Sequence, residues 1–209
     1  MNWTPDDTRE LLTLKENVDS DDIRIKEKIK EVLLNNRYLL HVIDNKDLEE
    51  LVDEDGTGAD EYYGVNILPN FIVNPTQHSA NTFICYEVGY NNINRALSTR
   101  SSSNRLPVEA KEIRITFEIL SNYKVLINQD TGIAKHDLLA ALIIDQFNMT
   151  NYFGKTLFLI ADEPSVVDND FACRTLTFGM ITDNNLVKTI DGVPRFANKI
   201  KGAHFVDVE

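Results

Sequence analysis

His136 and Asp137 are the adjacent residues of this sequence that most resemble a catalytic pair. In such a pair the carboxylate must orient the imidazole through space. Consecutive helix residues project about 100° apart, so these two side chains would not face each other. An aspartate in the first turn of a helix is also favoured by the helix dipole. We therefore interpret the pair as part of the start of a structural helix and predict no catalytic residue here.

The acidic stretch Asp53-Glu54-Asp55-Gly56 could be considered as a calcium site. An EF-hand loop needs oxygen ligands at alternating positions, with a glycine sixth and a glutamate twelfth, and these adjacent acids do not fit. The histidines lack HxxxH or HxH spacing, and Cys85 and Cys173 are too far apart in the sequence for a zinc motif. We predict no metal and no cofactor, and we interpret both cysteines as buried thiols made in a reducing compartment.

The motifs that bind phosphate or carry a nucleophile are missing from the sequence. There is no GxxxxGK[ST], GxGxxG or GxSxG pattern, and Gly56-Thr57-Gly58 is not followed by a helical pattern. We therefore expect a protein that is not an enzyme. A small hydrolase or nuclease with an unfamiliar site is the alternative. It would need acids at strand ends, whereas residues 44–61 hold nine acids and one lysine in what we interpret as a solvated loop without bound metal.

The overall charge restricts the kinds of partner. The chain has 33 acidic and 21 basic residues and a net charge of −12, which disfavours a DNA-binding surface. It is compatible with a surface that DNA passes without adhering, because like charges repel. The first residues lack a secretory signal, and no apolar run reaches the roughly 18–20 residues of a membrane span.

The one local concentration of uncompensated positive charge is the segment 91–110, which carries Arg95, Arg100 and Arg105. It is rich in Ser and Asn and has no apolar period, so we predict a loop. A loop of this length in a compact domain is unusual and often functional. Its arginines are candidate contacts to a neighbouring subunit, another protein or DNA phosphates. A solvated loop with scattered charges is the simpler alternative.

Two longer helices and one short helix are predicted from apolar spacing and capping residues. Ser20-Asp21-Asp22 opens the first, whose apolar stripe ends near Asn35-Asn36, and a short helix follows at 46–51. Asp130 or Thr131 caps the second long helix, which runs to about Phe147. Its residues 138–144 are all apolar, so we expect packing from both sides, by the sheet and by a second helix or another subunit.

Five strands are predicted, at 70–77, 81–90, 112–120, 155–163 and 171–181. The clearest is 112–120, whose residues alternate strictly between apolar and polar, so one face should be buried and the other wet or covered by a polar partner. We expect a hairpin-like link at His78-Ser79-Ala80. The order of elements predicts an α+β domain over 21–182, with a largely antiparallel sheet flanked by helices. Residues 1–20 are predicted to form a polar N-terminal arm and 183–209 a polar C-terminal tail.

Three segments together resemble a family of tailed-phage neck proteins, the tail terminators or tail completion proteins. They are EYYGVNILPNFIVNPTQHSANTFICYEV, DTGIAKHDLLAALIIDQFNMTNYFG and DEPSVVDNDFACRTLTFGMITDNNLVKT, and the similarity extends over about residues 21–190. It is an extended similarity without a catalytic motif. The segment 91–110 and the N-terminal arm have no firm counterpart in the family.

The resemblance implies an α+β protein that forms a ring, usually a hexamer, at the head-proximal end of the tail. Such a ring stops tail-tube polymerisation and joins the tube to the head-side connector or stopper. It implies no catalytic residue, a location in the neck of the virion after assembly in the host bacterial cytoplasm, and DNA that passes through the lumen. Another neck or tail-tube ring protein is the closest alternative, because such subunits also line a channel with a sheet.

Overall fold

The computed structural model describes most of the predicted α+β domain. The described residues are 5–6, 9, 21–53, 55–71, 80–93, 110–166 and 169–183. Nearly all of the predicted arm, most of the predicted strand at 70–77 with its link, and the predicted tail after Asp183 lie outside them. So do the positions 94–109 of the predicted loop.

The described elements confirm the predicted fold class, an α+β domain whose single sheet is mostly antiparallel. The sheet order is β1-β2-β3-β5-β4, and only the β1–β2 pairing is parallel. The helices are α2 (Asp21–Leu34), α3 (Arg37–Ile43), α4 (Lys46–Glu49) and α5 (Lys135–Phe147), with 3-10 turns η1 (Ala59–Tyr62) and η3 (Tyr123–Val125). The strands are β1 (Ile67–Leu68), β2 (Thr82–Ile93), β3 (Ala110–Asn122), β4 (Phe158–Val166) and β5 (Phe171–Asp183).

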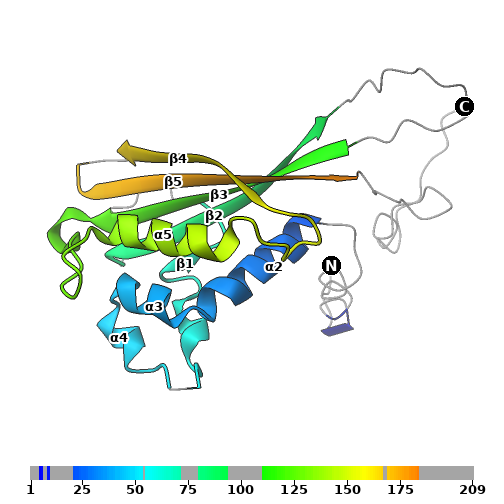
Figure 1. The fold of residues 1–209 in the computed structure, drawn as a ribbon. Coiled ribbons are helices and arrows are strands. Elements are labelled where there is room, and N and C mark those ends of the chain that lie inside the picture. Colours follow the sequence, from blue (N-terminus) through cyan, green and yellow to red (C-terminus); the bar gives the residue numbers. More distant parts are fainter. Residues whose placement is uncertain are drawn as a thin grey trace, which may run out of the picture.

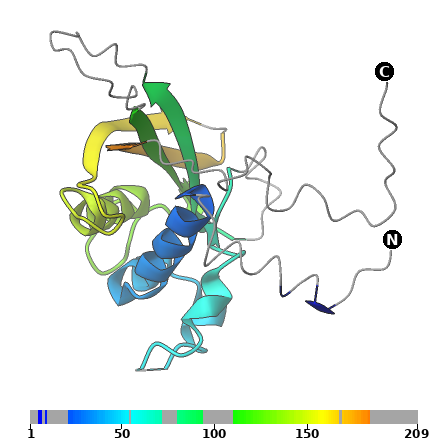
Figure 2. The same ribbon diagram turned by 90° about the vertical axis from the view of Figure 1, so that its right-hand side faces the viewer.

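The helices lie on one face of the sheet, so the domain has two layers (Figures 1 and 2). Helix α5 contacts β3 and β5, and α2 contacts β2. The long strands β2 and β3 extend beyond the helices, and α3 and α4 lie toward the other end of the molecule (Figure 1). The far face of the sheet, which carries none of the helices α2 to α5, is therefore a second surface of the described domain.

The alternation predicted for 112–120 is confirmed in β3. The apolar residues Ile113, Ile115, Phe117 and Ile119 point into the main core, which they form with the helices. The ring of Phe117 lies 5.2 Å from that of Phe147 in α5, which joins the sheet to the helix layer. Burying side chains of this size, at about 25 cal/mol per Å² of apolar surface, supplies most of the stability of the layer.

A second, smaller apolar cluster lies on the far face of the sheet, near the first residues of β2. Phe83 and Cys85 in β2 meet Phe171 and Cys173 in β5, with Leu120 of β3 between them. The rings of Phe83 and Phe171 lie 5.5 Å apart. Both cysteines are buried free thiols, as predicted, and burial raises the pKa of Cys173.

Helix α5 begins later than predicted. The helix starts at Lys135, whereas Asp130 and Thr131 belong to a preceding turn. The side chain of Asn128 accepts hydrogen bonds from the backbone N–H and the hydroxyl of Thr131, which holds that turn. Helix α5 contacts β3 and β5 of the sheet and, within the helix layer, α3. Ala141 on its outer side is exposed, so the predicted packing from both sides is met only in part.

One α-helix and one strand were not predicted. Helix α3 follows directly after Asn36, where the apolar stripe of the first helix ends. Asn36 caps α3 by accepting a hydrogen bond from the backbone N–H of Leu39. The partner of β2 on its outer side is β1, in parallel register with Ile84 and Cys85. Two residues are too few to show a period in sequence, so β1 could not be recognised. The segment 44–61 also contains α4, within the predicted short helix, and part of η1.

Candidate functional site

The side chains of His136 and Asp137 are not hydrogen-bonded to each other. The His136 Nε2 lies 3.6 Å from the Asp137 carboxylate, which exceeds a hydrogen-bond length. The Asp137 carboxylate instead accepts a hydrogen bond from Arg174 of β5. Burial, with a smaller contribution from Arg174, lowers the pKa of His136, and its Nδ1 is buried without a protein partner. A neutral, partly buried imidazole with no aligned carboxylate fits the structural interpretation.

Arg174 instead joins two acids from different elements. Its Nε and Nη2 donate to the two carboxylate oxygens of Asp162 in β4, at 2.6 and 2.8 Å, and its Nη1 donates to Asp137 in α5. The two-point contact lowers the pKa of Asp162. Such a paired, planar guanidinium is a strong link, and here it holds α5 against the β4–β5 edge of the sheet.

A second polar network surrounds His41 of α3. Its Nδ1 lies 2.8 Å from Glu49 of α4, and its Nε2 lies 3.0 Å from Asp130 before α5. The hydrogen bonds with Glu49 and then Asp130 raise the pKa of His41. His41 therefore connects three separate segments, and its protonation strengthens that connection.

The buried Lys135 completes this side of the molecule. Its ammonium donates to Asp44 at 2.8 Å, and Asp44 also pairs with Lys46 at 2.7 Å. Burial alone would raise the pKa of Asp44, but the hydrogen bonds from the two lysines outweigh it and the net pKa is lowered. Because the lysine is paired where it is buried, it serves as a structural clamp between α5 and the end of α3.

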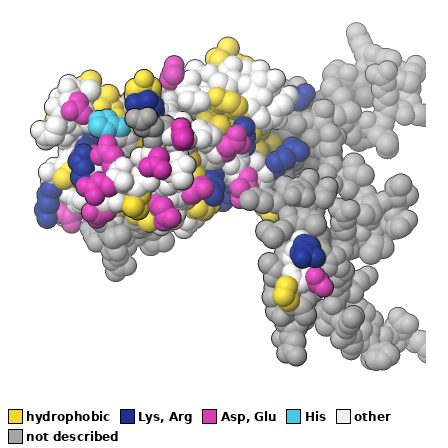
Figure 3. All heavy atoms as spheres, turned by 90° about the horizontal axis from the view of Figure 1, so that it is seen from below, with side chains coloured by type: hydrophobic (Ala, Val, Ile, Leu, Met, Phe, Trp, Pro, Cys, Tyr) yellow, Lys and Arg dark blue, Asp and Glu magenta, His cyan; other side chains and the backbone are white. Residues whose placement is uncertain are grey.

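Within the acidic segment 44–61, the chain between α4 and η1 turns at two glycines with positive φ, Gly56 at +80° and Gly58 at +92°. At Gly58 an added Cβ would lie 2.1 Å from the carbonyl oxygen of Leu51, so only glycine fits there. At Gly56 the same atom would meet nothing within 4 Å. Asp53 and Asp55 beside these glycines are exposed. Figure 3 shows acidic side chains spread over the helical side of the molecule, with lysines and arginines among them.

A groove of about 850 Å³ lies between α3 and this turn, and we call it the acidic groove. Its apolar lining comes from both elements, and its acidic residues are Glu49, Asp53 and Asp55. The full lining is Leu34, Asn35, Arg37, Tyr38, Leu40, His41, Glu49, Val52, Asp53, Asp55, Gly56, Ala59 and Tyr62.

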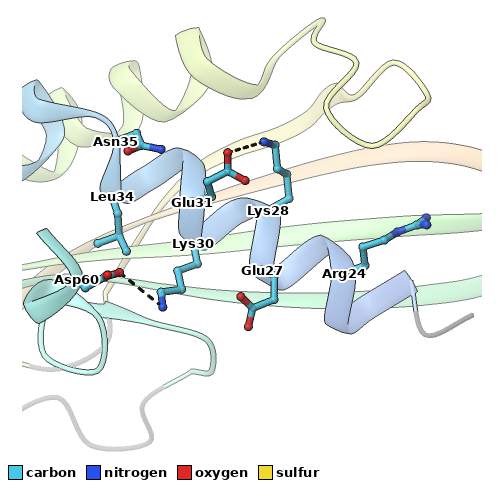
Figure 4. A pocket seen from close by; sticks show the side chains of 8 residues that line it. All are labelled: Arg24, Glu27, Lys28, Lys30, Glu31, Leu34, Asn35 and Asp60. Carbon is cyan, nitrogen blue, oxygen red and sulfur yellow. Dashed lines mark hydrogen bonds and ion pairs between the residues drawn. The ribbon is translucent and has the colours of Figure 1, made fainter. Parts of the chain in front are cut away.

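A smaller groove of about 510 Å³ runs along α2 (Figure 4). Lys28 pairs with Glu31 at 2.8 Å, and Lys30 reaches Asp60 at 3.7 Å. Each of these contacts pairs a lysine with an acid, so the opposite charges along the groove compensate each other. This groove therefore offers a ligand no strong local charge.

The far face of the sheet exposes apolar side chains near its β4 edge. Phe158, Ile160 and Ile181 are each about half exposed, and Ile160 lies over Gly179. Among the described strands, none pairs with the outer side of β4. The strand carries an irregularity at Ile160 and a proline, Pro164, which are typical of an edge that avoids indiscriminate pairing.

The predicted contact residues Arg95, Arg100 and Arg105 lie outside the described residues, so the structure does not place them. Within the described ranges, no group of three or more His, Cys, Asp or Glu side chains is gathered as a metal site would require. None of the described helices combines the length and apolar content needed to cross a bilayer.

Comparison with known families identifies the class of this chain. The YomW family matches residues 36–180, which include α3, α4, α5 and the described sheet except the last three residues of β5, and the chain belongs to this family. The family bears the name of a phage gene, which indicates a phage-encoded protein. A search of curated proteins gives no significant match.

Proposed function

We propose that this chain is a structural, non-enzymatic virion protein of a tailed phage, the tail terminator at the head-proximal end of the tail. The observation that carries the proposal is the one-sided sheet. Helices cover one face, while the other ends in an edge strand with half-exposed Phe158, Ile160 and Ile181. A subunit of a ring needs surfaces of this kind for its neighbours, and membership of a phage-named family supports the assignment.

The proposed assembly is a closed ring, expected to have six subunits, between the tail-tube protein and the head-side connector or stopper. Each subunit would contribute two different surfaces, since a ring is built from heterologous contacts. The net charge of −12 suits a lumen through which DNA moves without adhering. Another ring of the neck or tail tube is the alternative favoured by the same open sheet face.

Non-enzymatic function is supported by how the charged residues are used. Asp137 and Asp162 are held by Arg174, and Glu49 and Asp130 are held by His41. Each cluster connects separate elements of the fold. A catalytic constellation would instead direct such groups toward a substrate.

The test is genetic and structural. A phage lacking this gene should produce filled heads and separate tails, many of abnormal length, as counted by electron microscopy of lysates. Supplying the protein from a plasmid should restore joined particles, and native mass spectrometry of the neck complex should show a ring of this chain. Normal tail length and normal joining without the protein would overturn the proposal. Unjoined tails of normal length would favour a head-side ring instead.

A further inference from the structure

We propose that the acidic groove receives the segment 94–109 of a second copy of this chain, whose arginines contact Asp53 and Asp55. The inference rests on the proposed ring and names one pair of surfaces that meet between neighbouring subunits. It follows from the shape of the groove, from its charge, and from a length limit on the chain.

The groove offers both apolar and acidic contacts. Leu40, Val52 and Tyr62 contribute apolar lining, and the exposed Asp53 and Asp55 contribute carboxylates. Tyr38, also in the lining, is 68% exposed, and the guanidinium of Arg37, the one arginine of the lining, lies 5.8 Å from the centre of its ring. Exposed aromatic residues beside charged groups are typical of binding surfaces.

The charges of the groove and the segment are complementary. Glu49 is already bound by His41 and Lys46, whereas Asp53 and Asp55 have no ion pair among the described residues. The segment 94–109 contains three arginines and a single acid, Glu109, and also two leucines. Arginine binds carboxylates through two parallel hydrogen bonds, and the leucines can cover apolar lining.

The segment of the same chain is too short to reach the groove. It connects Ile93 to Ala110, so its midpoint lies at most about 29 Å from either anchor, at up to 3.6 Å per residue. The groove lies toward the other end of β2, because its residue Tyr62 accepts a hydrogen bond from Asn66, which in turn binds the carbonyl oxygen of Thr82. At about 3.3 Å per residue, β2 from Thr82 to Ile93 spans about 36 Å.

These lengths favour a contact between two copies over a contact within one chain. Figure 1 shows the C-terminal end of β2 and the N-terminal end of β3 at one extremity of the molecule, and α3 and α4 toward the other. A contact between two different surfaces of identical subunits is head-to-tail, and such contacts close into rings when the rotation between neighbours allows it.

Disulfide trapping tests the contact directly. The native cysteines are buried, so single exposed cysteines can be introduced as Asp55→Cys and, in a separately tagged copy, Arg100→Cys. Both are co-expressed in cells infected with the phage that lacks the gene. Mild oxidation should give at least about five times more doubly tagged covalent dimer than pairing Arg100→Cys with Asp145→Cys, an exposed control site on α5. Equal yields would overturn the inference. An intramolecular disulfide in a single chain that carries both cysteines would overturn it as well.

Charge reversal separates this inference from the proposed function. Asp53→Lys with Asp55→Lys should weaken subunit association at least about tenfold, and adding Arg→Glu changes at 95, 100 and 105 should restore most of it. The control with the same change in net charge is Asp145→Lys with Asp47→Lys, at exposed acids outside the groove lining. Circular dichroism should show that all variants fold. A ring unaffected by the groove variant would reject this contact and leave the terminator role standing. If the contact is trapped, but heads and tails also join normally in a phage that lacks the gene, the terminator role alone is rejected.

Discussion

Gly58 is the residue at which local geometry restricts the sequence most. Both Gly56 and Gly58 have positive φ, which costs a non-glycine residue about 1–2 kcal/mol. Gly58 alone has a backbone oxygen where a side chain would begin. We therefore expect Gly56→Ala to lower the free energy of unfolding by about 1 kcal/mol and Gly58→Ala by at least about 2 kcal/mol more. Urea denaturation of the two variants measures the difference, and equal losses would contradict the described turn.

His41 should make the stability depend on pH. Its folded-state pKa is raised by Glu49 and Asp130, so its contribution is complete below the unfolded value of about 6.5 and is lost as pH rises through the folded value. The stability difference between wild type and His41→Gln should therefore be larger at pH 6 than at pH 9, although below about 1 kcal/mol because the pair is exposed. Burial lowers the pKa of His136 and gives the opposite slope, but that residue is common to both proteins.

Thermal or urea unfolding at the two pH values measures this difference. A difference that stays constant with pH would show that the network around His41 does not form in solution.

At the residue level, the spacing of side chains within one helix could be predicted from the sequence. The side chains of the adjacent His136 and Asp137 are not hydrogen-bonded to each other, as helical geometry predicts. The partner of Asp137 could not be inferred, because Arg174 lies in a distant strand and only the sheet register brings it close. The same limit applies to His41 and Asp130.

Among the elements, α5 gives the sharpest test of the packing. Leu139 is fully buried toward the core, whereas Leu142 on the same helix is only partly buried. We expect Leu139→Ala to reduce the free energy of unfolding by about 2–5 kcal/mol, since it leaves a cavity. Leu142→Ala, the same chemical change, should cost roughly half as much or less. Urea denaturation followed by circular dichroism compares them, and a reversed order would mean that α5 presents a different face to the sheet.

Elements with a long, regular period were predictable, and short ones were not. Strict alternation identified β3, and the apolar run from 138 to 144 identified α5. The predicted start of α5 was wrong because a local hydrogen bond from the Thr131 backbone to Asn128 competes with helix formation there. Helix α3 had a usable signal, an asparagine cap before an apolar stretch, whereas the two residues of β1 had none.

For the whole molecule, the segment between β2 and β3 should be dispensable for folding and needed for assembly. Deleting residues 96–104 removes none of the residues of the two apolar clusters, so the free energy of unfolding should change by less than about 1 kcal/mol. The shortened protein should nevertheless fail to join heads to tails when it complements a phage that lacks the gene. Joined particles are counted by electron microscopy. A well-folded deletion that supports normal joining would contradict the prediction, and so would a deletion that unfolds.

The order of strands in the sheet has a consequence for synthesis on the ribosome. β3 is central, yet its second partner, β5, is made only after α5 and β4. Until Phe171 and the residues after it emerge, the nascent chain presents β3 as an open edge beside an incomplete core. Such edges recruit other chains. Nascent chains stalled before β5 should therefore depend on chaperones far more than the finished protein does.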